Sequence, residues 1–111
     1  MTQFDQAVLI WPVLALAART QIILSYSDLE GFTGIVAAGL GTPLGLIHRY
    51  CERRRYPRLN LIVVQRDSGL PGEGVPGKGM TPLEILVEQS KIYVFDWSGR
   101  DKPRAIDFEG L

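Results

Sequence analysis

Residues 42–65 read TPLGLIHRYCERRRYPRLNLIVVQ, and this stretch indicates the fold class. We expect Thr42 to be the N-cap of a helix, a position that threonine favours. Pro43 would then be the first helical residue, where a proline loses no hydrogen bond. Apolar residues then recur at three- and four-residue steps until Pro57, which ends the helical pattern. The apolar run 59–65 is rich in valine and isoleucine and predicts a strand. A helix over 42–56 followed by a strand is typical of the α+β class.

On the N-terminal side, residues 3–19 contain the apolar run AVLIWPVLALAA and predict a mostly buried helix with one defect at Pro12. The run is too short to cross a bilayer, and Asp5 lies where a secretory signal carries Lys or Arg. We therefore expect a cytoplasmic protein that makes no membrane contact. Ser25 or Ser27 is expected to cap a short second helix.

On the C-terminal side, residues 69–79 read GLPGEGVPGKG, and five glycines and two prolines predict a loop or a flat wing. Thr81 and Glu84 then form a capping-box pattern that predicts a helix start. This helix either continues to about Trp97 or breaks early, in which case residues 91–96 form a strand.

The composition limits the class of protein. The chain has 111 residues, of which 46% are hydrophobic, which is typical of one globular domain. We expect the domain to span residues 1–97 and residues 98–111 to form a polar tail. One cysteine and one histidine exclude a disulfide scaffold, an iron–sulfur cluster and a His-rich metal site. We expect no cofactor.

The net charge of zero conceals a strongly basic segment. Residues 48–66 carry six arginines against Glu52, whereas the segments on either side carry a net negative charge. Guanidinium groups match phosphate oxygens, so we expect DNA or another polyanion as partner. A basic helix that docks on an acidic protein, a homodimer that joins basic and acidic segments, and a solvated helix end remain alternatives. The candidate contacts are Arg49, Arg53, Arg54, Arg55 and Arg58, with Lys78 from the wing.

No catalytic arrangement is evident in the sequence. The glycine segment contains a GxxxxGK pattern, but Gly79 supplies no hydroxyl for magnesium and Pro76 supplies no N–H for phosphate. His48 and Cys51 lie three residues apart, yet Cys51 is on the apolar helix face, so we expect a buried thiol and a surface histidine. Glu88 is expected on a solvated helix face. We therefore expect a non-catalytic protein.

Several short segments follow one another in a recognisable order: SYSDL at 25–29, AGLGTPL at 38–44, the run from Pro57 to Val64, DSG at 67–69 with the glycine segment, and LEILVEQ at 83–89. This order resembles the C-terminal domain of the alkylguanine-DNA alkyltransferases and of their non-catalytic alkyltransferase-like relatives. The resemblance implies a winged-helix domain with three or four helices, a short β element and a Gly/Pro-rich wing. It also implies non-catalytic DNA binding.

The resemblance departs from the family at the reactive residues. Where the family has the motif Pro-Cys-His-Arg, this chain has Pro57-Arg58-Leu59-Asn60, so it lacks the cysteine that accepts the alkyl group. The arginine finger of the family corresponds to the region of Ala38. Tyr26 does match a family residue that approaches the DNA backbone, which makes it a further candidate contact.

Overall fold

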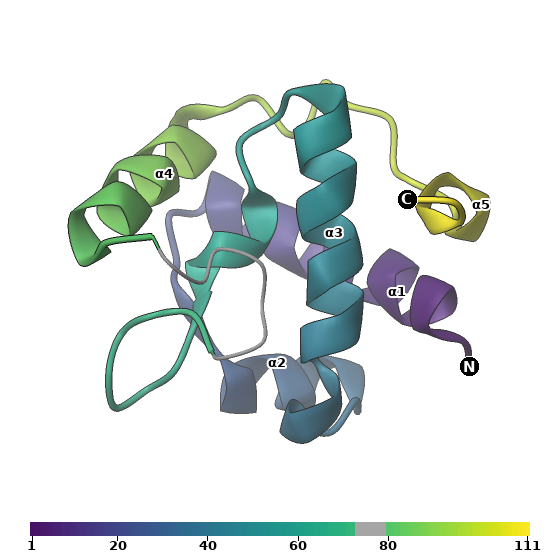
Figure 1. Ribbon diagram of the computed structural model, residues 1–111, viewed down its shortest axis with the longest axis horizontal. Coiled ribbons are helices and arrows are strands. Elements are labelled where there is room, and N and C mark those ends of the chain that lie inside the picture. Colours follow the sequence, from purple (N-terminus) through teal and green to yellow (C-terminus); the bar gives the residue numbers. More distant parts are fainter. Residues whose placement is uncertain (73–79) are drawn as a thin grey trace.

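The computed structural model describes residues 1–72 and 80–111 (Figure 1). These residues form five α-helices, two 3-10 helices (η1 and η2) and a two-stranded parallel sheet, in agreement with the α+β class. Three or four helices were expected, so the described residues contain at least one more than predicted. In chain order the elements are α1 (Gln3–Arg19), β1 (Leu24–Ser25), α2 (Tyr26–Thr33), η1 (Ala37–Gly39), α3 (Gly41–Arg54), η2 (Leu59–Ile62), β2 (Val63–Val64), α4 (Pro82–Val94) and α5 (Ala105–Phe108).

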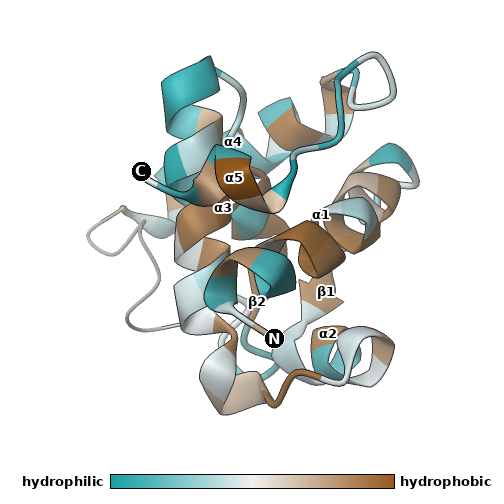
Figure 2. Cartoon of the chain, turned by 90° about the vertical axis from the view of Figure 1, so that its right-hand side faces the viewer, coloured by the Kyte–Doolittle hydropathy of each residue, from teal (hydrophilic) through white to brown (hydrophobic). Residues whose placement is uncertain are grey.

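Helix α3 is packed across α1 in the middle of the molecule, with α4 on one side and α5 on the other (Figure 1). Leu44, Ile47 and Cys51 are fully buried on the inner face of α3, at the spacing that the sequence predicted. Figure 2 shows strongly hydrophobic residues of α1 and α5 next to each other at the centre of the view. A single core therefore joins the first and the last helix.

Two of the predicted helix starts are confirmed. Ser25 caps α2, accepting a hydrogen bond from the Asp28 N–H, and the Asp28 carboxylate accepts one from the Ser25 N–H. Thr81 and Glu84 form the same reciprocal pair at the start of α4, with a proline at the first helical position. Each pair satisfies backbone N–H groups that have no partner inside the helix.

The start of α3 differs from the prediction. The helix begins at Gly41 and its N-cap is Leu40, whose side chain makes no capping hydrogen bond, so Thr42 is inside the helix. Leu40 is fully buried, which indicates that core packing rather than a polar cap fixes this helix end. The helix ends at Arg54 instead of residue 56.

The strand predicted over 59–65 shortens to β2, because residues 59–62 form η2 instead. All four residues of η2 are buried, so their apolar run reflects burial on every side rather than a pleated strand. The carbonyl of Leu61 accepts a hydrogen bond from the Gln89 side chain at 2.8 Å. The backbone of η2 is thus hydrogen-bonded by a side chain of α4, where a strand would be hydrogen-bonded by the backbone of a neighbouring strand.

Helix α4 continues through Ser90 and ends at Val94, so residues 91–94 are helical and no strand forms there. Beyond it, the indole N–H of Trp97 donates to the Ile92 carbonyl at 2.8 Å, which turns the chain back onto the helix. The expected helix end at Trp97 is therefore three residues too late.

The expected boundary between domain and tail at residue 97 does not separate the chain from the core. Residues 98–111 contain α5, and Phe108 is fully buried against Tyr50, with ring centroids 5.3 Å apart. The segment looks polar in the sequence because Phe108 is surrounded by charged residues. The buried residues Phe108 and Pro103, with Leu111 packed against the core, attach this segment to the domain.

Within residues 1–72 and 80–111, no single helix has the length and apolar character needed to cross a membrane. Helix α2 taken together with η1 and α3 reaches that length, across a bend of 96°.

Candidate functional site

The basic residues of the central segment are carried by the outer face of α3 and by the residues that follow it. Arg49, Arg53 and Arg54 are exposed, because the opposite face of the helix is packed into the core. Arg55 is the C-cap, in the left-handed conformation with φ 59°, and its N–H donates to the Glu52 carbonyl at 3.1 Å. Cations near this end of the helix interact favourably with its dipole.

The cations of the described residues fall into three groups. Four of them lie within 4.0 Å of a carboxylate: Arg58, Arg66, Lys91 and Arg104. Two others, Arg54 and Arg100, lie over aromatic rings. The remaining five have neither kind of partner among the described residues: Arg19, Arg49, Arg53, Arg55 and Lys102. Three of these five belong to α3 and its C-cap.

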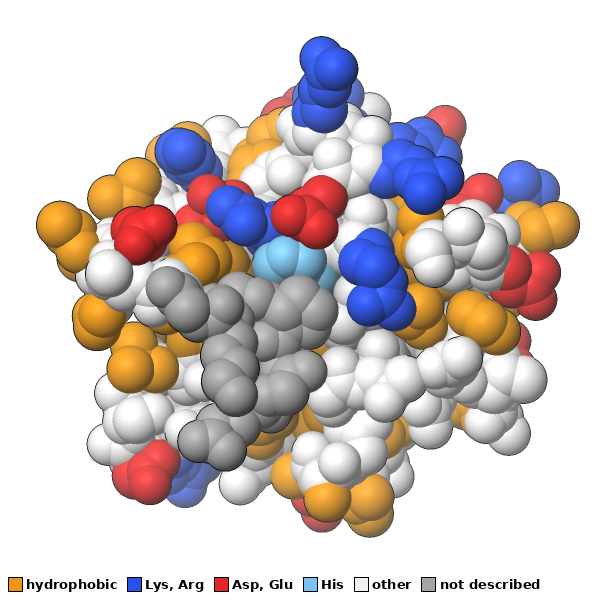
Figure 3. All heavy atoms as spheres, viewed as in Figure 1, with side chains coloured by type: hydrophobic (Ala, Val, Ile, Leu, Met, Phe, Trp, Pro, Cys, Tyr) orange, Lys and Arg blue, Asp and Glu red, His pale blue; other side chains and the backbone are white. Residues whose placement is uncertain are grey.

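The face of the molecule that carries α3 shows this distribution directly. In Figure 3, Lys and Arg side chains lie around the single histidine and one neighbouring acidic side chain over α3. Glu52 is the acidic residue within 4.0 Å of His48. Next to the histidine, the basic residues are therefore interrupted by the carboxylate of Glu52.

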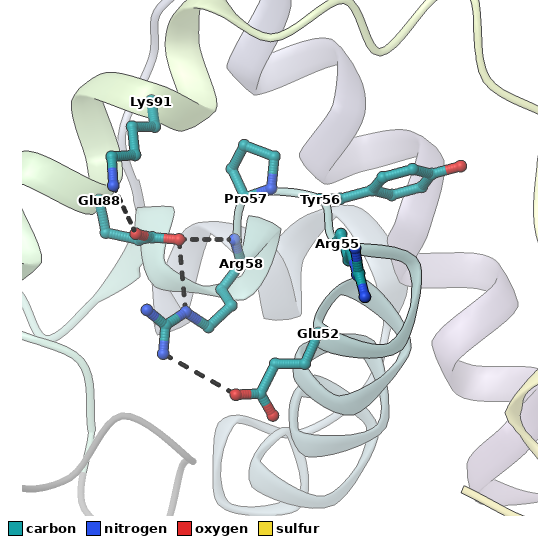
Figure 4. Close-up of a pocket in the computed structure, with 7 residues that line it drawn as sticks. All are labelled: Glu52, Arg55, Tyr56, Pro57, Arg58, Glu88 and Lys91. Carbon is teal, nitrogen blue, oxygen red and sulfur yellow. Dashed lines mark hydrogen bonds and ion pairs between the residues drawn. The ribbon is translucent and has the colours of Figure 1, made fainter.

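Between α3 and α4 lies an open pocket of about 460 Å³, which is lined by the exposed Arg55 and by an ion-pair network centred on Arg58 and Glu88 (Figure 4). The Glu88 carboxylate accepts hydrogen bonds from the backbone N–H of Arg58 at 3.1 Å and from its Nε at 3.3 Å. The Arg58 Nη1 also lies 3.9 Å from Glu52. Arg58, which the sequence predicted as a phosphate contact, is thus half-buried and forms ion pairs with two carboxylates.

Glu88 does not lie on a solvated face, as the sequence suggested, because it is buried beneath this network. Burial acts to raise the pKa of Glu88, but the hydrogen bonds and positive charge of Arg58 outweigh burial and lower it. Glu88 is therefore ionised at neutral pH and joins α4 to the segment that follows α3.

His48 is also buried, with 3% of its surface exposed, so the expectation of a surface histidine is wrong. Its Nδ1 lies 3.2 Å from Asn60 Oδ1, and its Nε2 lies 3.6 Å from Glu52 Oε1. Burial lowers the pKa of His48, which keeps the ring neutral at pH 7. Asn60 Nδ2 has no hydrogen-bond partner among the described residues. Nothing in the spacing of the sequence indicated the contact between His48 and Asn60.

The predicted thiol, Cys51, lies on the inner face of α3, and the predicted tyrosine, Tyr26, is half-buried at the start of α2. Cys51 is fully buried, as expected, and burial raises the pKa of its thiol to about 12, so it is a poor nucleophile.

The Tyr26 hydroxyl accepts a hydrogen bond from the Gly72 N–H at 2.8 Å and anchors the start of the glycine segment to α2. Lys78 and the rest of the expected wing at 73–79 lie outside the described residues.

The arrangement therefore brings together Arg49, Arg53, Arg54 and Arg55, and it removes Arg58 from the set of free cations. Sequence reasoning missed the pairing partner Glu88, whose buried position no local pattern reveals. It also missed Arg100, which lies in the segment expected to be a tail. No group of three metal-ligating side chains occurs within 1–72 and 80–111.

The fold and the site define a small α+β domain with a basic central helix. Comparisons with protein families, curated proteins and solved structures gave no match to this chain.

Proposed function

We propose that this domain binds nucleic acid without catalysing a reaction, and that α3 supplies the main contacts to the phosphate backbone. The observation that carries the proposal is the pair Arg49 and Arg53. These side chains lie on successive turns of α3, about 6 Å apart along the helix axis, and both are exposed. Neither has a carboxylate partner within the described residues, so their donors are available to phosphate oxygens.

The geometry of α2 and α3 supports the proposal. Helix α2 and the segment Ala37–Arg54, which contains η1 and α3, are bent by 96°, within the range of about 90–120° that helix-turn-helix motifs adopt. Residues 34–40 connect α2 to α3, a longer connection than the turn of about 3–4 residues in that motif. Gly34 ends α2 with φ 76°, a conformation that glycine adopts without strain. The Glu30 carboxylate then accepts a hydrogen bond from the Ala37 N–H, which stabilises the turn. In this motif the second helix, here α3, meets the nucleic acid.

The winged-helix interpretation belongs to the same proposal. Residues 69–79 would act as the wing, with Lys78 as its phosphate contact, and Tyr26 would hold the start of that segment through Gly72. Contacts of this kind position a protein on the duplex without specifying a sequence.

The test is a fluorescence-anisotropy titration of a labelled DNA duplex at two salt concentrations. Arg49→Glu and Arg53→Glu should each weaken binding about tenfold or more, and the double variant should abolish it, because each reversal replaces a phosphate contact with repulsion. Arg19→Glu is the matched control, since it changes the net charge equally at an exposed residue of α1. Equal losses in all three single variants, or unchanged binding of the double variant, would contradict the proposal.

A second candidate is a protein-interaction module whose basic helix docks on an acidic protein. It is favoured by the exposed apolar side chains of α4, of which Leu83, Leu86 and Val94 are 69%, 62% and 82% exposed. Absence of DNA and RNA binding at low salt, with the domain shown to be folded by circular dichroism, would favour this candidate over the first.

A further inference from the structure

A continuous cluster of aromatic rings lies between the C-terminal half of α3 and the segment after α4. Tyr50 and Tyr56 have ring centroids 6.3 Å apart, and Tyr56 is 5.3 Å from Phe95 and 6.1 Å from Trp97. In Figure 1, the chain beyond α4 passes over the C-terminal end of α3 on its way to α5. The cluster therefore fixes this segment beside the basic end of α3.

Two guanidinium groups rest on these rings. The Cζ of Arg54 lies 5.0 Å from the ring centroid of Tyr50. The Cζ of Arg100 lies 4.8 Å from the ring of Phe95 and 5.4 Å from that of Tyr56. Arg100 is further ordered by a turn, in which its N–H donates to the Trp97 carbonyl at 3.3 Å.

An aromatic ring and a carboxylate interact with a guanidinium group in different ways. A carboxylate competes for the N–H donors: Glu88 accepts a hydrogen bond from the Nε of Arg58 at 3.3 Å, and Asp107 lies 3.6 Å from the Nε of Arg104. A ring attracts the cation through its π face and leaves the N–H donors free. Neither Arg54 nor Arg100 has a carboxylate within 4.0 Å in the described part of the chain. Both are therefore oriented cations whose side chains make no hydrogen bond within residues 1–72 and 80–111, although Asp107 and Asp96 lie close enough for their charges to interact with Arg54 and Arg100, respectively.

We infer that Arg54 and Arg100 form a second phosphate contact, which receives the phosphodiester backbone of nucleic acid at the C-terminal end of α3. The inference rests on the proposed function and extends its surface to a residue outside the basic segment. Arg49 and Arg53 contact the backbone along the helix, and the two ring-held arginines contact it where it crosses the helix end. Because the rings restrict these side chains before binding, less conformational entropy is lost when phosphate binds.

The experiment measures the affinity for a labelled 20-base-pair DNA duplex over a series of salt concentrations. In wild-type protein, the slope of log K against log salt counts the phosphate contacts, with about 0.9 for each. Arg54→Gln and Arg100→Gln should each reduce the magnitude of the slope by about 0.9 and weaken binding. Arg104→Gln is the matched control, because Arg104 is exposed in the same C-terminal segment but paired with Asp107, and it should leave the slope unchanged.

Arg100→Lys separates charge from geometry. Lysine retains the positive charge but lacks the planar group that stacks on Phe95, so the slope should be retained while the affinity falls. This variant also keeps the test informative if Arg100→Gln proves unstable in thermal unfolding.

The possible failures are distinguishable. If wild-type protein binds and Arg49→Glu weakens binding, but neither glutamine variant changes the slope, the inference is wrong and the proposed function stands. A slope change equal to that of Arg104→Gln would also overturn it. If wild-type protein does not bind the duplex at low salt, both the proposed function and this inference fall.

Discussion

Replacing Glu88 by alanine should be the most destabilising single change in the network between α3 and α4. The substitution removes the acceptor of two hydrogen bonds from Arg58, at 3.1 and 3.3 Å. A hydrogen bond to a charged group contributes about 1.5–3 kcal/mol, and a buried N–H left without a partner costs about 1–3 kcal/mol. The Arg58 side chain is 29% exposed and can regain water, so we take the lower part of these ranges and expect a loss of about 3 kcal/mol.

For a chain of 111 residues, about 1 kcal/mol corresponds to a change of about 4 °C in Tm, so Glu88→Ala should lower Tm by about 10–15 °C. Glu88→Gln retains one acceptor oxygen and should cost less, about 1–2 kcal/mol. The assay is urea unfolding followed by the fluorescence of the buried residues Trp11 and Trp97. Glu109→Gln, at an exposed position, serves as the control.

The pH dependence of stability gives an independent check. The pKa of Glu88 in the folded protein is below its ordinary value of 4.5, so its contribution is complete above that pH. The contribution is lost as the pH falls below 4.5 through the folded pKa, and the difference between wild type and Glu88→Gln should shrink there. A loss below about 0.5 kcal/mol for Glu88→Ala at pH 7, or a difference that grows in acid, would refute the reasoning.

Three further predictions concern the core and the helix ends. Phe108→Ala should cost about 3–5 kcal/mol in urea unfolding, because it empties a fully buried site; unchanged stability would mean that residues 98–111 are not part of the core. Cys51, with a pKa of about 12, should react with a thiol reagent at pH 8 only after unfolding, and rapid labelling of native protein would contradict its burial. Thr81→Ala should cost about 1 kcal/mol while Thr81→Ser costs little, and equal losses in the two variants would exclude the capping hydrogen bond.

The parts of the fold that the sequence predicts correctly depend on local chemistry. The starts of α2 and α4 are determined by Ser25 and Thr81, whose hydrogen bonds close within three residues. The extent of α1 follows from one apolar run, and Pro12 lies inside the helix without ending it. Patterns of this range can be read from a single sequence.

The parts that the sequence does not predict depend on contacts between distant residues. The run 59–62 is apolar because α3 and α4 cover it, and an apolar run cannot by itself distinguish a buried strand from a buried turn. His48 meets Asn60 across twelve residues, and Arg58 meets Glu88 across thirty. The basic segment was evident in the sequence, but which of its arginines are paired could be established only in three dimensions.

The parallel pairing of β1 with β2 has a consequence for the order in which the molecule opens. Leu24 pairs with Val63 and Ser25 with Val64, so the whole of α2 and α3 lies between the paired residues along the chain. Local fraying of one helix end cannot separate the strands without displacing the buried side chains of Leu24 and Val63. The amide protons of this short sheet should therefore exchange with deuterium only through near-global unfolding, and their exchange rates should report the stability of the entire domain.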